Sequence, residues 1–434
     1  MRQRVAKRES QAPAWAIGLM LFLFTLMLAW ATWAPTFLNT KTGGDQILEA
    51  YFQRMICSPE QITGWPINDG DTATALGAFV PSLPAFLATK SACAIAAMAQ
   101  FSATSAFLVV GIFLTVFTTS LAARSAGLHW PTALLIGYGM ATAPCSFSRF
   151  GHLQLSQLWP IMPCIVTCAI LLGRSTYPAG EKGSLHQYGS FGIVMGALSF
   201  TAQDYYAVFS CVCIFTCYIV GMFRQIKADR FAVQADAPDR ASPDRRWRYR
   251  FIASGYIAVM IFTLASKRLY WAIPYWSLGA TNRWPIEQHI YGFWPLNVLT
   301  SPIINPALKS AFAWANLPVT ETPFGSSSGI VVLISLGILL ACWTSTKPLH
   351  AQRLPSNSAY IFSYGGVLLT TLLLSAFVAA PGGLGMLFNV FVSPQLRAMN
   401  RITPYFYCAA LTICAISLCS LLSNLLHHRP ETRP

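Results

Sequence analysis

The chain has 434 residues, of which 54% are hydrophobic and only 10% are charged, and it carries a net charge of +14. Soluble domains contain about 25% charged residues, so this composition excludes an ordinary water-soluble protein and indicates that a bilayer surrounds much of the chain. Its basic residues lie between apolar stretches and form no zinc-finger or RNA-binding motif. The positive charge therefore indicates membrane orientation, and nucleic acid is excluded as a partner.

The hydrophobic stretches predict an all-α fold, a polytopic transmembrane bundle of about ten spans that forms one domain over residues 1–434. The first stretch also has the pattern of a signal peptide, but its length of about 20 apolar residues fits a retained anchor better. The predicted spans are, in chain order, about 15–34, 101–123, 131–145, 155–172, 191–202, 206–222, 251–265, 329–343, 360–378 and 405–426.

The charges between the spans predict one topology. Two long extracytoplasmic loops, 35–90 and 267–328, alternate with shorter turns, and 224–250 is a charged cytoplasmic loop that we expect to be mobile. This arrangement leaves 19 of the 29 Lys and Arg residues inside and 10 outside. The bias follows the positive-inside rule and predicts that both termini are cytoplasmic.

Eleven of the 12 cysteines lie in or beside apolar stretches, and only Cys57 lies clearly in a loop. No CxxC pair occurs, so the sequence predicts that the eleven, Cys93 among them, are small hydrophobic packing residues.

Eight of the 15 acidic residues fall on the predicted outer face. Asp45 lies about ten residues beyond the first span, where an acid could take a proton from a hydroxyl at the membrane surface; it would equally cap a helix that begins near Gln46. Asp69 and Asp71 have a D-x-D spacing that could hold a divalent cation through carboxylate oxygens. A polar turn around Gly70 explains the same pair.

Three other outer positions carry polar side chains beside apolar spans. His152 follows Arg149 in the turn before the fourth span, and this cation pair suits a phosphate or snorkelling to lipid headgroups. Asp204 lies in the turn before the sixth span, where the neighbouring Tyr205 and Tyr206 are typical of a membrane interface. A structural hydrogen bond is the alternative role for both His152 and Asp204. Glu287 lies four residues after Arg283, a spacing that is also that of an ordinary helical pair.

Arg397 and Arg401 precede the last span and are four residues apart, so on a helix they share one face. Two like charges on one face repel unless an anion lies between them. The pair therefore indicates a phosphate or carboxylate site, with lipid headgroups as the alternative anion.

Several short motifs follow one another along the outer face. They are Gly44-Asp45, Gly151-His152-Leu153, Tyr205-Tyr206, Glu287…Tyr291-Gly292 and the stretch from Pro381 to Arg401. In this order they resemble bacterial polytopic proteins of the GT-C glycosyltransferase type, and some relatives resemble the membrane part of phosphoglycerol-transferase-like proteins. The resemblance covers most of the chain, and its most specific motif runs from Gly382 to Arg401.

The resemblance implies a glycosyltransferase of the bacterial inner membrane with a polyprenyl-phosphate-linked sugar donor and an extracytoplasmic acceptor. In such families an acid of the first outer loop is the catalytic base, and the match here is Asp45. We expect Arg397 and Arg401, with His152, to bind the donor phosphate, and Asp204 and Glu287 to orient the acceptor or those cations. Membrane lipids are further partners, and a divalent cation is a candidate cofactor. Two other classes remain open: a translocator of lipid-linked sugar or polysaccharide, and a non-catalytic membrane assembly subunit.

Overall fold

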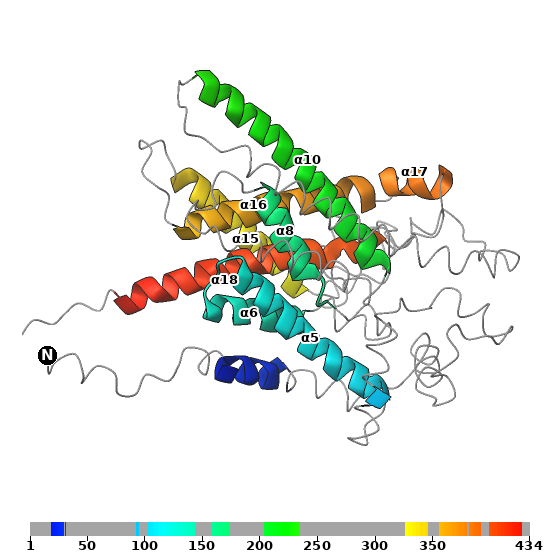
Figure 1. The fold of residues 1–434 in the computed structure, drawn as a ribbon, viewed down its shortest axis with the longest axis vertical. Helices are drawn as coiled ribbons and strands as arrows, with labels where there is room; N and C mark the ends of the chain where they lie inside the picture. Colours follow the sequence, from blue (N-terminus) through cyan, green and yellow to red (C-terminus); the bar gives the residue numbers. More distant parts are fainter. Residues whose placement is uncertain are drawn as a thin grey trace, which may run out of the picture.

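A computed structural model describes residues 19–29, 31, 93–94, 103–143, 158–172, 204–234, 326–345, 356–379, 382–391 and 399–427. Over these ranges the chain is almost entirely helical and contains no strand, which confirms the predicted all-α class. The elements, shown in Figure 1, are α5 (Ala103–Ser125), α6 (Trp130–Ala141), α8 (Ile161–Leu172), α10 (Asp204–Gln234), α15 (Ser326–Ser345), α16 (Ser356–Leu374), the π-helix η4 (Ser375–Ala379), α17 (Leu384–Phe391), the 3₁₀ helix η5 (Met399–Ile402) and α18 (Thr403–His427).

Two helical segments in the described ranges, Tyr360–Val378 and Thr403–Leu425, are long and apolar enough to cross a membrane. Five shorter apolar helices accompany them, the first being Leu19–Ala29. These seven helices coincide with seven of the predicted spans, and α6 coincides with an eighth, 131–145. The other two predicted spans, 191–202 and 251–265, lie outside the described residues, so the count of ten stays a prediction.

Helix α10 is longer than the sequence pattern predicts. The sixth span was expected to end near Met222, but the helix continues to Gln234. The first eleven residues of the segment predicted as a charged loop, 224–234, are therefore helical. Leaving an apolar environment does not end a helix. The strong helix breakers are Gly and Pro, and neither occurs between Phe223 and Gln234.

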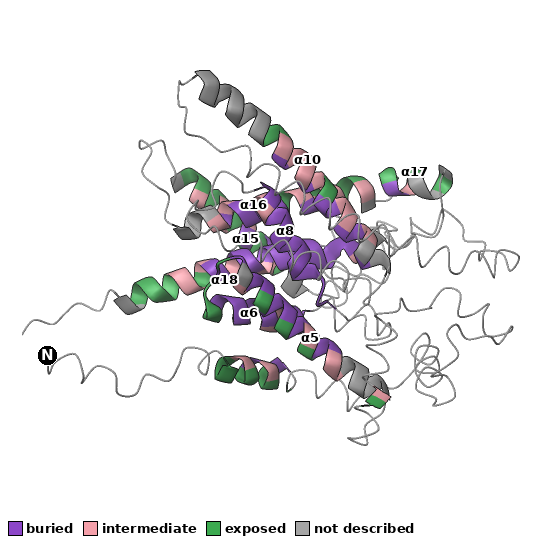
Figure 2. Ribbon diagram, viewed as in Figure 1, coloured by how far each residue is buried: buried purple, intermediate pink, exposed green. Residues whose placement is uncertain are grey.

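Helix α8 lies at the centre of the described bundle. Eleven of its twelve residues are buried, and it packs against α5, α10, α16 and α18 (Figure 2). Such a helix is apolar on every side because every side has a protein neighbour. Two buried hydroxyls bind α8 and the residues directly before it: Ser363 Oγ donates to the Ala169 carbonyl oxygen at 2.8 Å, and Thr118 Oγ1 donates to that of Trp159, two residues before the helix, at 2.8 Å.

The outer helices show the opposite pattern, because large apolar side chains cover their exposed faces. Met27 is 69% exposed, Trp343 on α15 is 72% exposed and Leu425 near the end of α18 is 62% exposed. Exposed apolar faces of this extent are unfavourable in water. They suit helices whose outer sides contact lipid, in agreement with the composition.

Contacts between the helices fix their relative directions. Gly127, with φ +91°, allows the tight turn that sets α6 antiparallel to α5, and Gly137 packs against Val116 and Ser120. Helices α8 and α10 instead run in the same direction, because Cys164 contacts Ser210 near their first turns and Leu171 contacts Gly221 further along both. The chain between α8 and α10 must therefore return to the end of the bundle where α8 began.

Candidate functional site

Two of the predicted site residues lie in the described part of the chain. Asp204 is the first residue of α10, and Arg401 lies in η5, directly before α18. Helix α10 and η5 pack against each other, so these positions, 197 residues apart in the sequence, belong to adjoining elements. We call this region, formed by the first turns of α10 and α18 together with η5, the α10–η5 junction.

The remaining predicted site residues fall outside the described residues. They are the proposed base Asp45, the phosphate-binding candidates His152 and Arg397, the orienting candidate Glu287, and the metal candidates Asp69 and Asp71.

A buried tyrosine holds the α10–η5 junction together. Tyr405, in the first turn of α18, donates its hydroxyl hydrogen to the Tyr206 carbonyl oxygen at 2.6 Å. Its oxygen also lies 2.8 Å from Ser210 Oγ. A phenol has only one hydrogen to donate, so Ser210 is the donor in the second bond. Both bonds join the first two turns of α10 to α18, and all three side chains are fully buried.

Aromatic packing adds to these hydrogen bonds. The Tyr405 ring meets the rings of Tyr206 and Phe209 edge to face, with centroids 6.4 Å apart in both pairs. This geometry is the favoured one for aromatic pairs. Tyr206 is 0% exposed, because the packing of α18 against α10 covers it.

The π-helix η4 supports the other side of η5. It continues α16 from Ser375, whose Oγ donates to the Thr371 carbonyl oxygen at 2.7 Å. A π-turn widens a helix locally and is frequent near functional sites. Here it lies against η5, so the segment that carries Arg401 is held between η4 and α10.

Arg401 lies next to the start of a helix. It is partly exposed, whereas Ile402 and Thr403 directly after it are buried. Helix α18 begins two residues later, and the start of a helix has a positive electrostatic potential. An arginine next to a helix start favours a phosphate or carboxylate group.

The cysteines inside the bundle show no comparable chemistry. Cys164, Cys168, Cys213 and Cys217 are buried between α8 and α10 as free thiols. Among the residues that the structure describes, no group of three or more His, Cys, Asp and Glu side chains could hold a metal ion. These four cysteines act as small packing residues, as the sequence predicts.

Sequence reasoning missed Tyr405 and Ser210. A Tyr in the first turn of an apolar span is a detectable signal, because a buried phenol needs a hydrogen-bond partner. The identity of that partner could not be predicted, since Tyr206 lies 199 residues away and offers a backbone carbonyl.

Replacing Tyr405 by Phe should lower the free energy of unfolding by about 1–3 kcal/mol, since the Tyr206 carbonyl and the Ser210 hydroxyl each lose a buried partner. Tyr218→Phe is the matched control in the same bundle, because Tyr218 is only partly buried on α10. Thermal unfolding in detergent compares the two variants. Equal melting temperatures would show that Tyr405 does not hold the junction together.

Comparison of the chain with protein-family models, with curated proteins and with solved structures gave no match.

Proposed function

We propose that the chain is a membrane glycosyltransferase that moves a sugar from a polyprenyl-phosphate-linked donor to an extracytoplasmic acceptor, with inversion. The observation that carries the proposal is the packing of η5 against the start of α10. It sets the end of the Gly382–Arg401 motif, on which the resemblance to GT-C enzymes mainly rests, beside the turn that contains Asp204. One cation-bearing and one acid-bearing segment thus adjoin at one end of the bundle.

The proposed reaction is a single displacement. The acceptor hydroxyl oxygen bonds to the anomeric carbon while the bond from that carbon to the donor phosphate oxygen breaks. Asp45 takes the hydroxyl proton, and polyprenyl phosphate leaves with the bonding electron pair. Arg401, with Arg397 and His152, stabilises the charge on the leaving phosphate. Asp204 and Glu287 orient the acceptor, and any divalent cation would act through Asp69 and Asp71.

The proposed topology has ten spans, with both termini in the cytoplasm of a bacterial cell. The shared direction of α8 and α10 supports it, because a chain that begins both helices at one end must cross an odd number of times between them. The predicted fifth span, 191–202, supplies one such crossing. The α10–η5 junction then faces outward, on the side where a lipid-linked donor would react.

Replacing Arg401 by Gln should weaken donor binding about 10–100-fold, since a hydrogen bond to a charged group contributes about 1.5–3 kcal/mol. The control is Arg224→Gln. Arg224 is exposed on the same helix as Asp204 but 20 residues further along, about 30 Å away. Transfer rates measured over a range of donor concentrations should show a raised KM for the Arg401 variant alone. Unchanged donor dependence in that variant would remove Arg401 from the phosphate site.

A translocator would use the same cations, but it would also need a polar path through the bundle. Among the described residues, the buried side chains include no charged group, and seven of the 14 buried Ser and Thr residues donate to a carbonyl four residues earlier in their own helix. The absence of buried charge in these ranges favours a reaction at one end of the bundle.

A further inference from the structure

Cys93 differs from the other cysteines that the structure describes. It lies in a short helical segment ten residues before α5 and is disulfide-bonded. The nine others are free thiols on α8, α10, α15 and α18. The expectation that Cys93 is a packing residue is therefore wrong. A cross-link requires a second cysteine close in space and an oxidising compartment, which the apolar surroundings in the sequence do not reveal.

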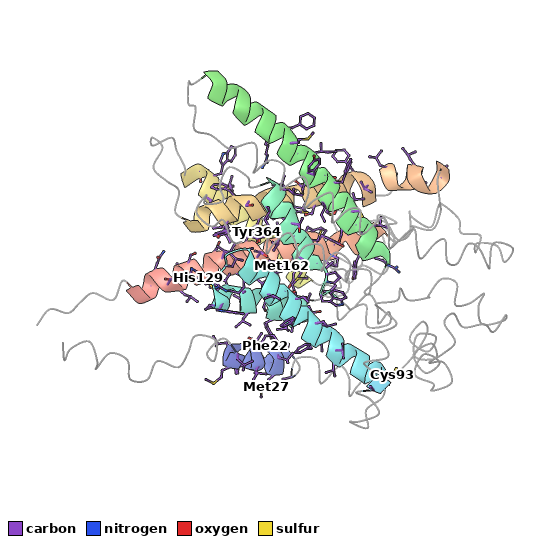
Figure 3. All side chains as sticks on the ribbon, viewed as in Figure 1. Phe22, Met27, Cys93, His129, Met162 and Tyr364 are labelled. Carbon is purple, nitrogen blue, oxygen red and sulfur yellow. The ribbon has the colours of Figure 1, made fainter. Side chains whose placement is uncertain are left out.

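The contacts around α5 show which end of the bundle carries this bond. The Tyr407 hydroxyl reaches the Gly139 carbonyl, so the last turn of α6 lies beside the first turns of α18. Since α5 and α6 are antiparallel, α5 begins at that same end. Figure 3 shows Cys93 at the beginning of α5 and His129 at the opposite end. Cys93 thus lies at the same end of the bundle as the α10–η5 junction.

The opposite end of the bundle is basic. Arg124, in the last turn of α5, donates to the Leu128 carbonyl oxygen at 2.8 Å and lies 5.4 Å from the centre of the Trp130 ring. Arg224 is exposed on α10 at this end. Disulfides persist in oxidising compartments, whereas basic residues accumulate on the cytoplasmic side. Redox state and charge therefore give the same orientation independently.

Elimination limits the partner of Cys93 to two residues. Of the 12 cysteines, nine are free, so only Cys57 and Cys145 remain. Of these two, Cys57 is the one that lies clearly in a loop, and the predicted extracytoplasmic loop that contains it, 35–90, ends just before Cys93. We therefore take Cys57 as the partner, and a Cys145→Ser variant distinguishes the two pairings.

We propose that Cys93 and Cys57 form a structural disulfide on the oxidising face of the membrane. The bond closes the chain between them and joins the first extracytoplasmic loop to the start of the second span. It also assigns the α10–η5 junction to the oxidising side. If the proposed function holds, the bond anchors the loop that carries Asp45. That last consequence rests on the proposed function, whereas the disulfide and the orientation do not.

Counting thiols in the full-length protein tests the pairing without any assay of activity. The chain is denatured and treated with a maleimide carrying a polymer tag, before and after reduction. We expect reduction to expose two further thiols in the wild type and in Cys145→Ser, and none in Cys57→Ser or Cys93→Ser. The pairing would be overturned if reduction exposed no further thiols in the Cys145→Ser variant, or none in the wild type. Non-reduced peptide mapping of the wild type gives the same answer if a variant fails to fold.

Labelling of intact spheroplasts tests the orientation separately. A membrane-impermeant reductant followed by an impermeant maleimide should label wild-type protein without permeabilisation, and Cys57→Ser/Cys93→Ser should lose this label. Labelling that requires permeabilised membranes would place Cys93 in the cytoplasm and reverse the orientation. Neither result depends on sugar transfer. The proposed disulfide can therefore be rejected without rejecting the proposed function, and the proposed function can be rejected without rejecting the disulfide.

Discussion

Replacing Asp45 by Asn should lower sugar transfer by about 10²–10⁴-fold, the usual contribution of a general base. Asn keeps the size of the side chain and its helix-capping ability but cannot accept the acceptor proton. The measurement is transfer of labelled sugar from a polyprenyl-phosphate donor by protein in proteoliposomes. The amount of protein in the membrane should not change, because a charge in an outer loop contributes little to insertion.

Glu49→Gln is the matched control for this experiment. Glu49 lies four residues after Asp45 in the same predicted loop and has no role in the proposed reaction. Its variant should keep wild-type transfer, so a loss confined to Asp45→Asn separates the base from the general charge of the loop. Full activity in the Asp45→Asn variant would show that Asp45 is not the catalytic base. That result would agree with a translocator, which binds phosphate but takes no proton from an acceptor.

Gly221→Ala in α10 should lower stability as much as the Tyr405 substitution does. A Cβ atom at this position would meet the backbone carbonyl oxygen of Leu171 at the end of α8. A backbone atom cannot rotate away as a flexible side chain can, so α8 and α10 must separate locally. Overpacking of this kind costs about 1–3 kcal/mol, although Ala is otherwise the better helix former.

Gly337→Ala in α15 is the matched control. It makes the same chemical change within a helix, but a Cβ there has no neighbour within 4 Å. We expect this variant to be as stable as the wild type or slightly more stable, since Ala favours the helical state. Melting temperatures in one detergent compare the two variants. If the Gly221→Ala variant had the same melting temperature as the Gly337→Ala variant, this result would contradict the close approach of α8 and α10.

The fold class and most helix positions could be predicted from the sequence, because apolar length and charge bias are local properties. The end of α10 could not, since the predicted loop began where polarity changed while the helix ended further on, at Gln234. Cys93 was misjudged for a related reason. Its neighbours in the sequence are apolar, and they carry no sign that Cys93 is disulfide-bonded.

The candidate site divides in the same way. The sequence by itself determined that acids and arginines gather on one predicted face, because a charge inside a bilayer is costly and is moved to its edges. Only the tertiary structure decided that the segments of Asp204 and Arg401 adjoin. That contact depends on the Tyr405 hydroxyl meeting a carbonyl 199 residues away. The acceptor is a backbone carbonyl, a group that every residue has, so the residue types do not reveal this contact. It forms only when the helices pack together.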